Sequence, residues 1–129
     1  MTGKLLDTTV LVDLSRGNSA AADFVDSARA SDVPLFISVV SAMELVAGCR
    51  GKAEVEKAEK LVASFNVVYL SLASSSKAYE LVLAYSKSHG LAIPDAFIAA
   101  TALVQGLEIA SDNARHFQVI PELTVERPY

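Results

Sequence analysis

Short apolar runs recur along the chain, and helical patterns fill the gaps between them. The runs lie at residues 4–6, 35–38, 67–70 and 107–110, and the run at 35–38 shows no alternation of polar and apolar positions. Such runs are typical of strands that are covered on both faces of a sheet. Residues 124–126 predict a short fifth strand. Because one or two helices separate successive runs, the pattern predicts an α/β three-layer sandwich, with a mostly parallel four- to five-stranded sheet flanked by helices.

The helices are predicted from apolar residues at helical spacing and from their start and stop residues. Ser19 is a suitable N-cap for the second helix, and Ser41-x-x-Glu44 has the form of a capping box at the third. Gly90 and Gly106 follow the last two helices as stop residues. The predicted helices span residues 8–16, 19–30, 41–48, 52–64, 73–89 and 94–105.

The last of these helices is apolar on every face over residues 96–104, apart from Thr101. A helix of this kind lies inside a packed protein or in a membrane. Pro94 fits its first turn, where the missing N–H costs nothing. Asp95 puts one carboxylate at the N-terminal end of the helix. A charge beside so apolar an element costs free energy unless another group pairs with it.

The composition, 52% hydrophobic and 20% charged, fits one soluble domain over residues 1–129. The first residues are too short and too acidic for a signal peptide. Pro94, Asp95 and Gly106 leave the apolar helix below the roughly 20 residues that a membrane span needs. Cys49 is most simply a small core residue. As the one cysteine it excludes an internal disulfide and suits a reducing compartment, so we expect a cytoplasmic protein with no membrane contact.

Acidic residues follow the predicted strands at the points where ligands bind in parallel sheets, outside the carboxyl ends. Asp7 follows the first strand, Glu44 lies in the first turns after the second, and Asp112 and Asn113 follow the fourth. Asp95 begins the helix that leads into the fourth strand, so topology alone does not fix its edge. The net charge of −4 gives no basic footprint for nucleic acid, although bound divalent cations would reverse the local sign.

Each acid also has a purely structural interpretation. Asp7 can cap the helix after it, Glu44 can belong to the capping box, Asp95 can complement the helix dipole, and Asp112-Asn113 can form a turn. Taken together, carboxylates at one edge repel one another unless protons or cations neutralise them. Oxygen ligands without a Cys/His cluster favour Mg²⁺ or Mn²⁺, which indicates metal-assisted hydrolysis. His89 and His116 are too isolated to suggest ligands.

Four segments carry these residues in a fixed order. They read Leu5-Leu6-Asp7-Thr8-Thr9-Val10-Leu11, Ser38-x-x-Ser41-x-x-Glu44-Leu45, Ile93-Pro94-Asp95-Ala96-Phe97-Ile98-Ala99-Ala100-Thr101-Ala102, and Ser111-Asp112-Asn113-Ala114-Arg115-His116-Phe117. Ile120-Pro121-Glu122-Leu123 follows as a tail. With these motifs the chain resembles the PIN-domain nucleases, and within them the VapC-type toxins of type II toxin–antitoxin pairs. The resemblance covers nearly the whole chain as a single PIN domain.

The resemblance implies a metal-dependent endoribonuclease. It implies one or two Mg²⁺ or Mn²⁺ ions, a metal-activated water that leaves 5′-phosphate and 3′-hydroxyl ends, a cognate antitoxin protein and a homodimer. The fourth motif departs from the commonest form, because Asn113 stands where Asp is frequent, so the fourth ligand is Asp112 or Asn113. The implied site comprises Asp7, Glu44, Asp95, Asp112 and Asn113, supported by Thr8, Ser41 and Ser111.

Two other functions use the same acidic edge. One is a catalytically decayed PIN-like module that binds RNA or protein, its fourth motif having changed at Asn113. The other is a phosphatase-like α/β phosphohydrolase, which is disfavoured because Asp7-Thr8-Thr9 lacks the second nearby Asp of an aspartyl-phosphate enzyme. For RNA, the candidate phosphate contacts, each also explained as a solvated charge, are Arg16, Arg50, Lys52 and Arg115.

Overall fold

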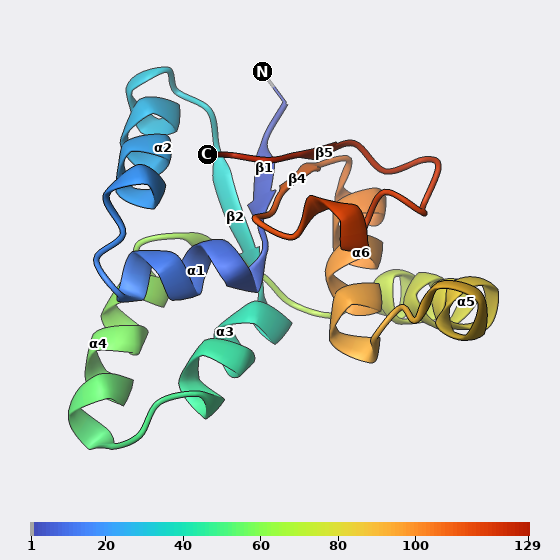
Figure 1. Ribbon diagram of the computed structural model, residues 1–129, viewed down its shortest axis with the longest axis horizontal. Coiled ribbons are helices and arrows are strands. Elements are labelled where there is room, and N and C mark those ends of the chain that lie inside the picture. Colours follow the sequence, from blue (N-terminus) through green and yellow to red (C-terminus); the bar gives the residue numbers. More distant parts are fainter. Residues whose placement is uncertain (1) are drawn as a thin grey trace.

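The computed structural model describes residues 2–129, which form one five-stranded sheet. The sheet lies between helices (Figure 1). The strand order is β3-β2-β1-β4-β5, and every neighbouring pair is parallel. The predicted α/β sheet is therefore confirmed, with the fifth strand included. The strands are β1 (Lys4–Leu6), β2 (Leu35–Ser38), β3 (Asn66–Val68), β4 (Glu108–Ala110) and β5 (Val125–Glu126).

Helices cover both faces of the sheet, in two groups that lie on either side of it in Figure 1. Leu5 and Ile109 face α5 and α6, whereas Leu6, Ile37 and Ala110 pack with residues of α1 to α4. The sandwich therefore has two cores, one on each face of the sheet. The helices are α1 (Thr8–Ser15), α2 (Ser19–Ala30), α3 (Val39–Ala47), α4 (Lys52–Ala63), α5 (Leu72–His89) and α6 (Ile93–Gln105), and a 3₁₀ turn spans Ala114–His116.

The apolar helix predicted near the end of the chain is α6, and its middle is fully enclosed. Pro94 lies in its first turn, and Gly106 ends it in the left-handed conformation at φ 68°. A residue other than glycine would be strained at that φ, which explains the stop. Residues buried along α6 are Ala96, Ile98, Ala99, Ala100, Thr101 and Ala102.

The register of the sheet decides where the acidic residues meet. Leu6 of β1 pairs with Ile37 of β2 on one side and with Ala110 of β4 on the other. The three central strands therefore end almost level. The residues that follow them, beginning with Asp7 and Ser111, leave the sheet from the same edge.

The start of α3 differs from the prediction. Ser38, the last residue of β2, is the N-cap, and its side chain accepts a hydrogen bond from the Val40 N–H at 3.1 Å. Ser41 lies inside the helix and is buried, so the predicted capping box of Ser41 and Glu44 is wrong. The chain passes from β2 into α3 without a loop, and the hydroxyl at the end of the strand is therefore the one beside the free N–H groups.

Other boundaries shift by one or two residues. Asn18 rather than Ser19 caps α2, and Ser71 caps α5 in a reciprocal pair with Ser74. Strand β3 ends at Val68 because its partner β2 ends opposite it, at Ser38. Among residues 2–129, none of the helices is both long and apolar enough to cross a bilayer.

Candidate active site

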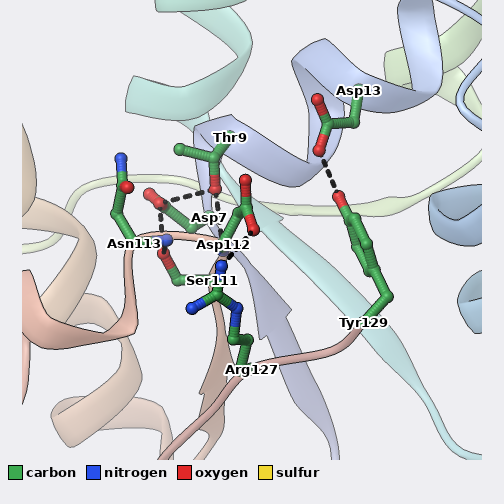
Figure 2. Close-up of polar contacts among 8 residues, drawn as sticks. All are labelled: Asp7, Thr9, Asp13, Ser111, Asp112, Asn113, Arg127 and Tyr129. Carbon is green, nitrogen blue, oxygen red and sulfur yellow. Dashed lines mark hydrogen bonds and ion pairs between the residues drawn. The ribbon is translucent and has the colours of Figure 1, made fainter.

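Asp7 is the buried centre of the site, with 3% of its surface exposed. It occupies the N-cap position of α1, but its side chain makes no cap hydrogen bond, so the capping interpretation is wrong. Its Oδ2 instead accepts hydrogen bonds from the hydroxyls of Ser111 at 2.7 Å and Thr9 at 3.1 Å (Figure 2). Two hydroxyls thus fix one oxygen of the Asp7 carboxylate, which does not cap α1.

The same two hydroxyls tie the segment after β4 to the start of α1. Ser111 Oγ accepts a hydrogen bond from the Asn113 N–H at 3.0 Å, and Thr9 Oγ1 accepts one from the Asp112 N–H at 3.2 Å. The first and fourth sequence motifs are therefore joined through hydrogen bonds around Asp7. This network sets the backbone that carries Asp112 and Asn113.

Glu44 projects from the second turn of α3 and is held by α1. The Thr8 hydroxyl donates a 2.7 Å hydrogen bond to Glu44 Oε1 and lies 2.9 Å from the hydroxyl of buried Ser41. Thr8 and Ser41 thus support Glu44, although by a route different from the capping box that the spacing predicted. The first and second motifs meet at this contact.

Asp95 lies in the first turn of α6 and is partly buried. Burial raises its pKa, and the negative charges of Asp7 and Glu44 raise it further, whereas His116 lowers it. His116 Nδ1 lies 3.7 Å from Asp95 Oδ2. Since the charges of Asp7 and Glu44 act on Asp95, the three acids share one electrostatic environment, and the edge that topology left open for Asp95 is the acidic one.

A hollow of about 400 Å³ brings the predicted acids together. Ser41 and Ser111 lie behind its wall rather than on it, as their burial and hydrogen bonds require. We call this hollow the acidic hollow. Its lining residues are Asp7, Thr8, Thr9, Val12, Asp13, Glu44, Asp95, Asp112, Asn113 and His116.

Asp112 and Asn113 both line the acidic hollow, so the structure leaves either as the fourth ligand. Asp112 Oδ1 lies 3.5 Å from Arg127 Nη2, a contact seen in Figure 2. Asn113 is exposed, and its side chain is a neutral oxygen donor without such a partner among the residues that the structure describes. Arg127 therefore competes with a cation for Asp112 and not for Asn113.

Several residues of this edge were not predicted from the sequence. Asp13 lines the acidic hollow, and the Tyr129 hydroxyl donates a 2.5 Å hydrogen bond to its Oδ2 (Figure 2). The four-residue step from Thr9 to Asp13, which puts both on one face of α1, was the available signal. His116, Arg127 and Tyr129 have no local signal, because their contacts depend on how the last residues fold back over the sheet edge.

The donor set fits a hard divalent cation. The acidic hollow offers carboxylate, hydroxyl and amide oxygens, the ligands that Mg²⁺ and Mn²⁺ prefer, and its acids repel one another. As the side chains stand, no three Asp, Glu, His or Cys residues within residues 2–129 form a ready ligand group. An ion would therefore have to draw the carboxylates inward.

The PIN domain family model matches residues 4–123. This chain belongs to the PIN-domain family. The PIN domain is 41% identical over 120 residues to Ribonuclease VapC10 of Mycobacterium tuberculosis, covering 92% of this chain and 89% of that protein. It is 36% identical over 130 residues to Ribonuclease VapC19 of the same organism, covering 98% and 99% of the two chains.

A solved toxin–antitoxin complex from Klebsiella pneumoniae contains a chain with the same fold. The PIN domain matches it with a TM-score of 0.80 and 28% identity, over 98% of each chain. Together with the two ribonucleases, this match assigns the PIN domain to the VapC group and confirms the resemblance seen in the motifs.

Proposed function

We propose that this PIN domain is an endoribonuclease that acts as the toxin of a toxin–antitoxin pair. The observation that carries the proposal is the convergence of Asp7, Glu44, Asp95 and Asp112 on one hollow at the carboxyl ends of β1, β2 and β4. The VapC relatives, which are named ribonucleases, support the same activity.

We propose that the reaction needs Mg²⁺ or Mn²⁺, with one or two ions held by Asp7, Glu44 and Asp95 and by Asp112 or Asn113. When bound, such an ion lowers the pKa of a water molecule and stabilises negative charge on the phosphodiester. Attack by water leaves 5′-phosphate and 3′-hydroxyl ends and does not need the RNA 2′-OH.

The protein's own residues hold the acids in place for this chemistry. The hydroxyls of Ser111 and Thr9 fix one oxygen of Asp7, and the Thr8 hydroxyl fixes one oxygen of Glu44. Each carboxylate keeps a second oxygen free of these bonds. These bonds restrict the side chains of Asp7 and Glu44, so these two acids lose less freedom when a cation and a phosphate arrive.

The proposed partners are an antitoxin protein and a second copy of the PIN domain, and the proposed compartment is the cytoplasm. The solved Klebsiella pneumoniae relative is a toxin–antitoxin complex, which supports an antitoxin here. We expect a segment of the antitoxin to cover the acidic hollow and to keep RNA or cations out.

The test is cleavage of RNA with Mn²⁺ by the native protein and by Asp7→Asn and Asp95→Asn. Both variants should lose cleavage, whereas the matched control Asp26→Asn, on the exposed face of α2, should retain it. Equal activity in all four proteins would contradict the proposed site. RNA binding without any metal-dependent cleavage by the native protein would instead indicate the decayed binding module.

A further inference from the structure

A second hollow, of about 350 Å³, adjoins the acidic hollow and shares Asp95 and His116 with it. It lies between the end of α5, the start of α6 and the 3₁₀ turn after β4. Its other lining residues are His89, Gly90, Leu91, Ala92, Arg115 and Val119. We call it the basic hollow, because every ionisable group on it except the shared Asp95 is an Arg or a His.

Arg115 is the one arginine that lines the basic hollow, and its guanidinium lies outside the ion pairs of residues 2–129. Arg115 is exposed. Other cations near the sheet are engaged: Arg127 pairs with Asp112, and Lys4 pairs with Glu126. Arg115 precedes His116, which lines both hollows. A guanidinium whose donors are free in this position, beside an acidic site, is suited to binding a phosphate.

His89 gives the basic hollow an oriented aromatic ring. Its Nδ1 lies 2.7 Å from Ser88 Oγ, and its ring meets that of Tyr85 edge to face, with centroids 6.0 Å apart. These contacts fix the plane of a ring that remains exposed to solvent. Fixed aromatic rings beside basic side chains are how proteins stack the bases of single-stranded RNA.

The hollow on the opposite side of the acidic hollow differs in charge. It is larger, about 580 Å³, and it shares Glu44 with the acidic hollow. There Arg16, Arg50 and Lys57 face a second acid, Glu54, whose Oε1 also accepts a hydrogen bond from the Arg50 N–H. Two acids and no aromatic ring line this larger hollow, whereas the basic hollow sets Arg115 beside the ring of His89 and has Asp95 as its one acid.

We propose that the basic hollow is the subsite for the nucleotide next to the scissile phosphate of a single-stranded RNA. Arg115 contacts the phosphate of that nucleotide, and His89 stacks on its base. A volume of about 350 Å³ is near the lower limit for ligand pockets, which suits one nucleotide and not several. This proposal rests on the proposed ribonuclease function, because Asp95 and His116 join the two hollows.

The test uses a fluorescein-labelled single-stranded RNA with the full chain in EDTA, and follows its binding by anisotropy from low to high KCl. Each lost phosphate contact on single-stranded nucleic acid should lower the slope of log K against log salt by about 0.7. Arg115→Gln should show this change and a several-fold rise in Kd. The matched control is Arg29→Gln, at the amino ends of β2 and β3, where the guanidinium binds the Ser64 carbonyl; its slope should equal the native one.

Two further readouts separate the parts of the proposal. In Mn²⁺, Arg115→Gln should raise KM several-fold and leave kcat within about a factor of two, because the acids are untouched. His89→Ala should weaken RNA binding, and His89→Phe, which keeps an aromatic face, should restore it. If His89→Phe binds no better than His89→Ala, base stacking at His89 is overturned.

The subsite and the ribonuclease can fail separately. Native cleavage with an unchanged salt slope and KM in Arg115→Gln would overturn the subsite and leave the enzyme intact. Absence of cleavage by the native protein would overturn the enzyme, and the salt slope would still decide whether Arg115 contacts RNA.

Discussion

Ser111 and Asp7 are 104 positions apart in the sequence, and the Ser111 hydroxyl donates a 2.7 Å hydrogen bond to Asp7 Oδ2. Both residues are buried, each at the end of a neighbouring strand. A buried carboxylate needs donors of this kind, because an unpaired charge away from water is costly. The bond therefore links the stability of the sheet edge to the placement of the proposed central ligand.

Replacing Ser111 with Ala should damage both stability and cleavage. The change removes the donor to Asp7 and the acceptor of the Asn113 N–H, and the loss of such a buried partner costs about 1–3 kcal/mol. If Asp7 holds a metal, loss of a supporting contact should also lower cleavage about 10- to 100-fold. Urea unfolding and RNA cleavage measure the two effects. The control is Ser76→Ala, on the exposed side of α5, and native activity in Ser111→Ala would refute the role of the hydroxyl.

Thr8 offers a test of how Glu44 is positioned. Thr8→Val keeps the shape of the side chain and removes the hydroxyl that donates to Glu44 at 2.7 Å, whereas Thr8→Ser keeps the donor. We expect Thr8→Val to lower Mn²⁺-dependent cleavage by about tenfold and Thr8→Ser to remain within about twofold of native. Equal losses in the two variants would mean that the methyl group, and not the hydroxyl, matters.

The fold and the acidic edge were predictable because their signals are local. The apolar runs fix the strands, and an acid placed directly after an apolar run, as Asp7 is, indicates its edge once the sheet is parallel. Gly106 fixed the end of α6 for the same reason. The edge at which Asp95 lies could not be predicted from such local signals, since it depends on how far α6 reaches across the sheet.

The long-range supporting contacts were not predictable, because the residues that they join meet only once the sheet and helices have packed. Ser41 fits a capping box by spacing, yet the hydroxyl at the end of β2 captures the free N–H group and leaves Ser41 to Thr8. Asp7 fits an N-cap by position, yet Ser111 and Thr9 take its oxygen. In both cases a tertiary hydrogen bond, from Thr8 to Ser41 and from Ser111 to Asp7, engages the side chain for which the spacing suggests a capping role.

Asp95→Asn should stabilise the protein when divalent cations are absent. Burial, Asp7 and Glu44 raise the pKa of Asp95 in the folded state, so folding favours its protonated form. The stabilisation that comes from protonated Asp95 is therefore complete below the unfolded pKa of about 4, and it is lost as the pH rises through the raised pKa of the folded state. At neutral pH the uncharged amide of the variant removes the repulsion from Asp7 and Glu44. A gain of about 1 kcal/mol in the free energy of unfolding would raise Tm by roughly 4 °C. Thermal unfolding in EDTA at pH 4 and pH 7 should show the gain at pH 7 only, whereas a loss at pH 7 would contradict the repulsion.

Mn²⁺ should stabilise the native protein if the acidic hollow binds it. A ligand that binds only the folded state adds about 2.7 kcal/mol at one hundred times its Kd, which raises Tm by several degrees. Asp7→Asn and Asp95→Asn should shift less, and Asp26→Asn should shift as the native protein does. Thermal unfolding over a MnCl₂ series, followed by excess EDTA, measures the effect. Identical shifts in all four proteins would place the binding elsewhere.

Tyr129 and Asp13 give a prediction about the segment that crosses the acidic edge. Tyr129→Phe removes a 2.5 Å hydrogen bond to a carboxylate, and the loss should cost about 1–2 kcal/mol at pH 7. Burial first, and then the bond and charge of Asp13, raise the pKa of Tyr129 above its ordinary value of about 10. The stabilisation is therefore complete below pH 10 and declines above it, as the unfolded chain ionises first. Urea unfolding at pH 7 and pH 11 should show a difference between native and Tyr129→Phe that shrinks at pH 11. Tyr79→Phe, at an exposed position of α5, should differ from native at neither pH; a Tyr129 difference that grew at pH 11 would mean that Asp13 does not favour the neutral phenol.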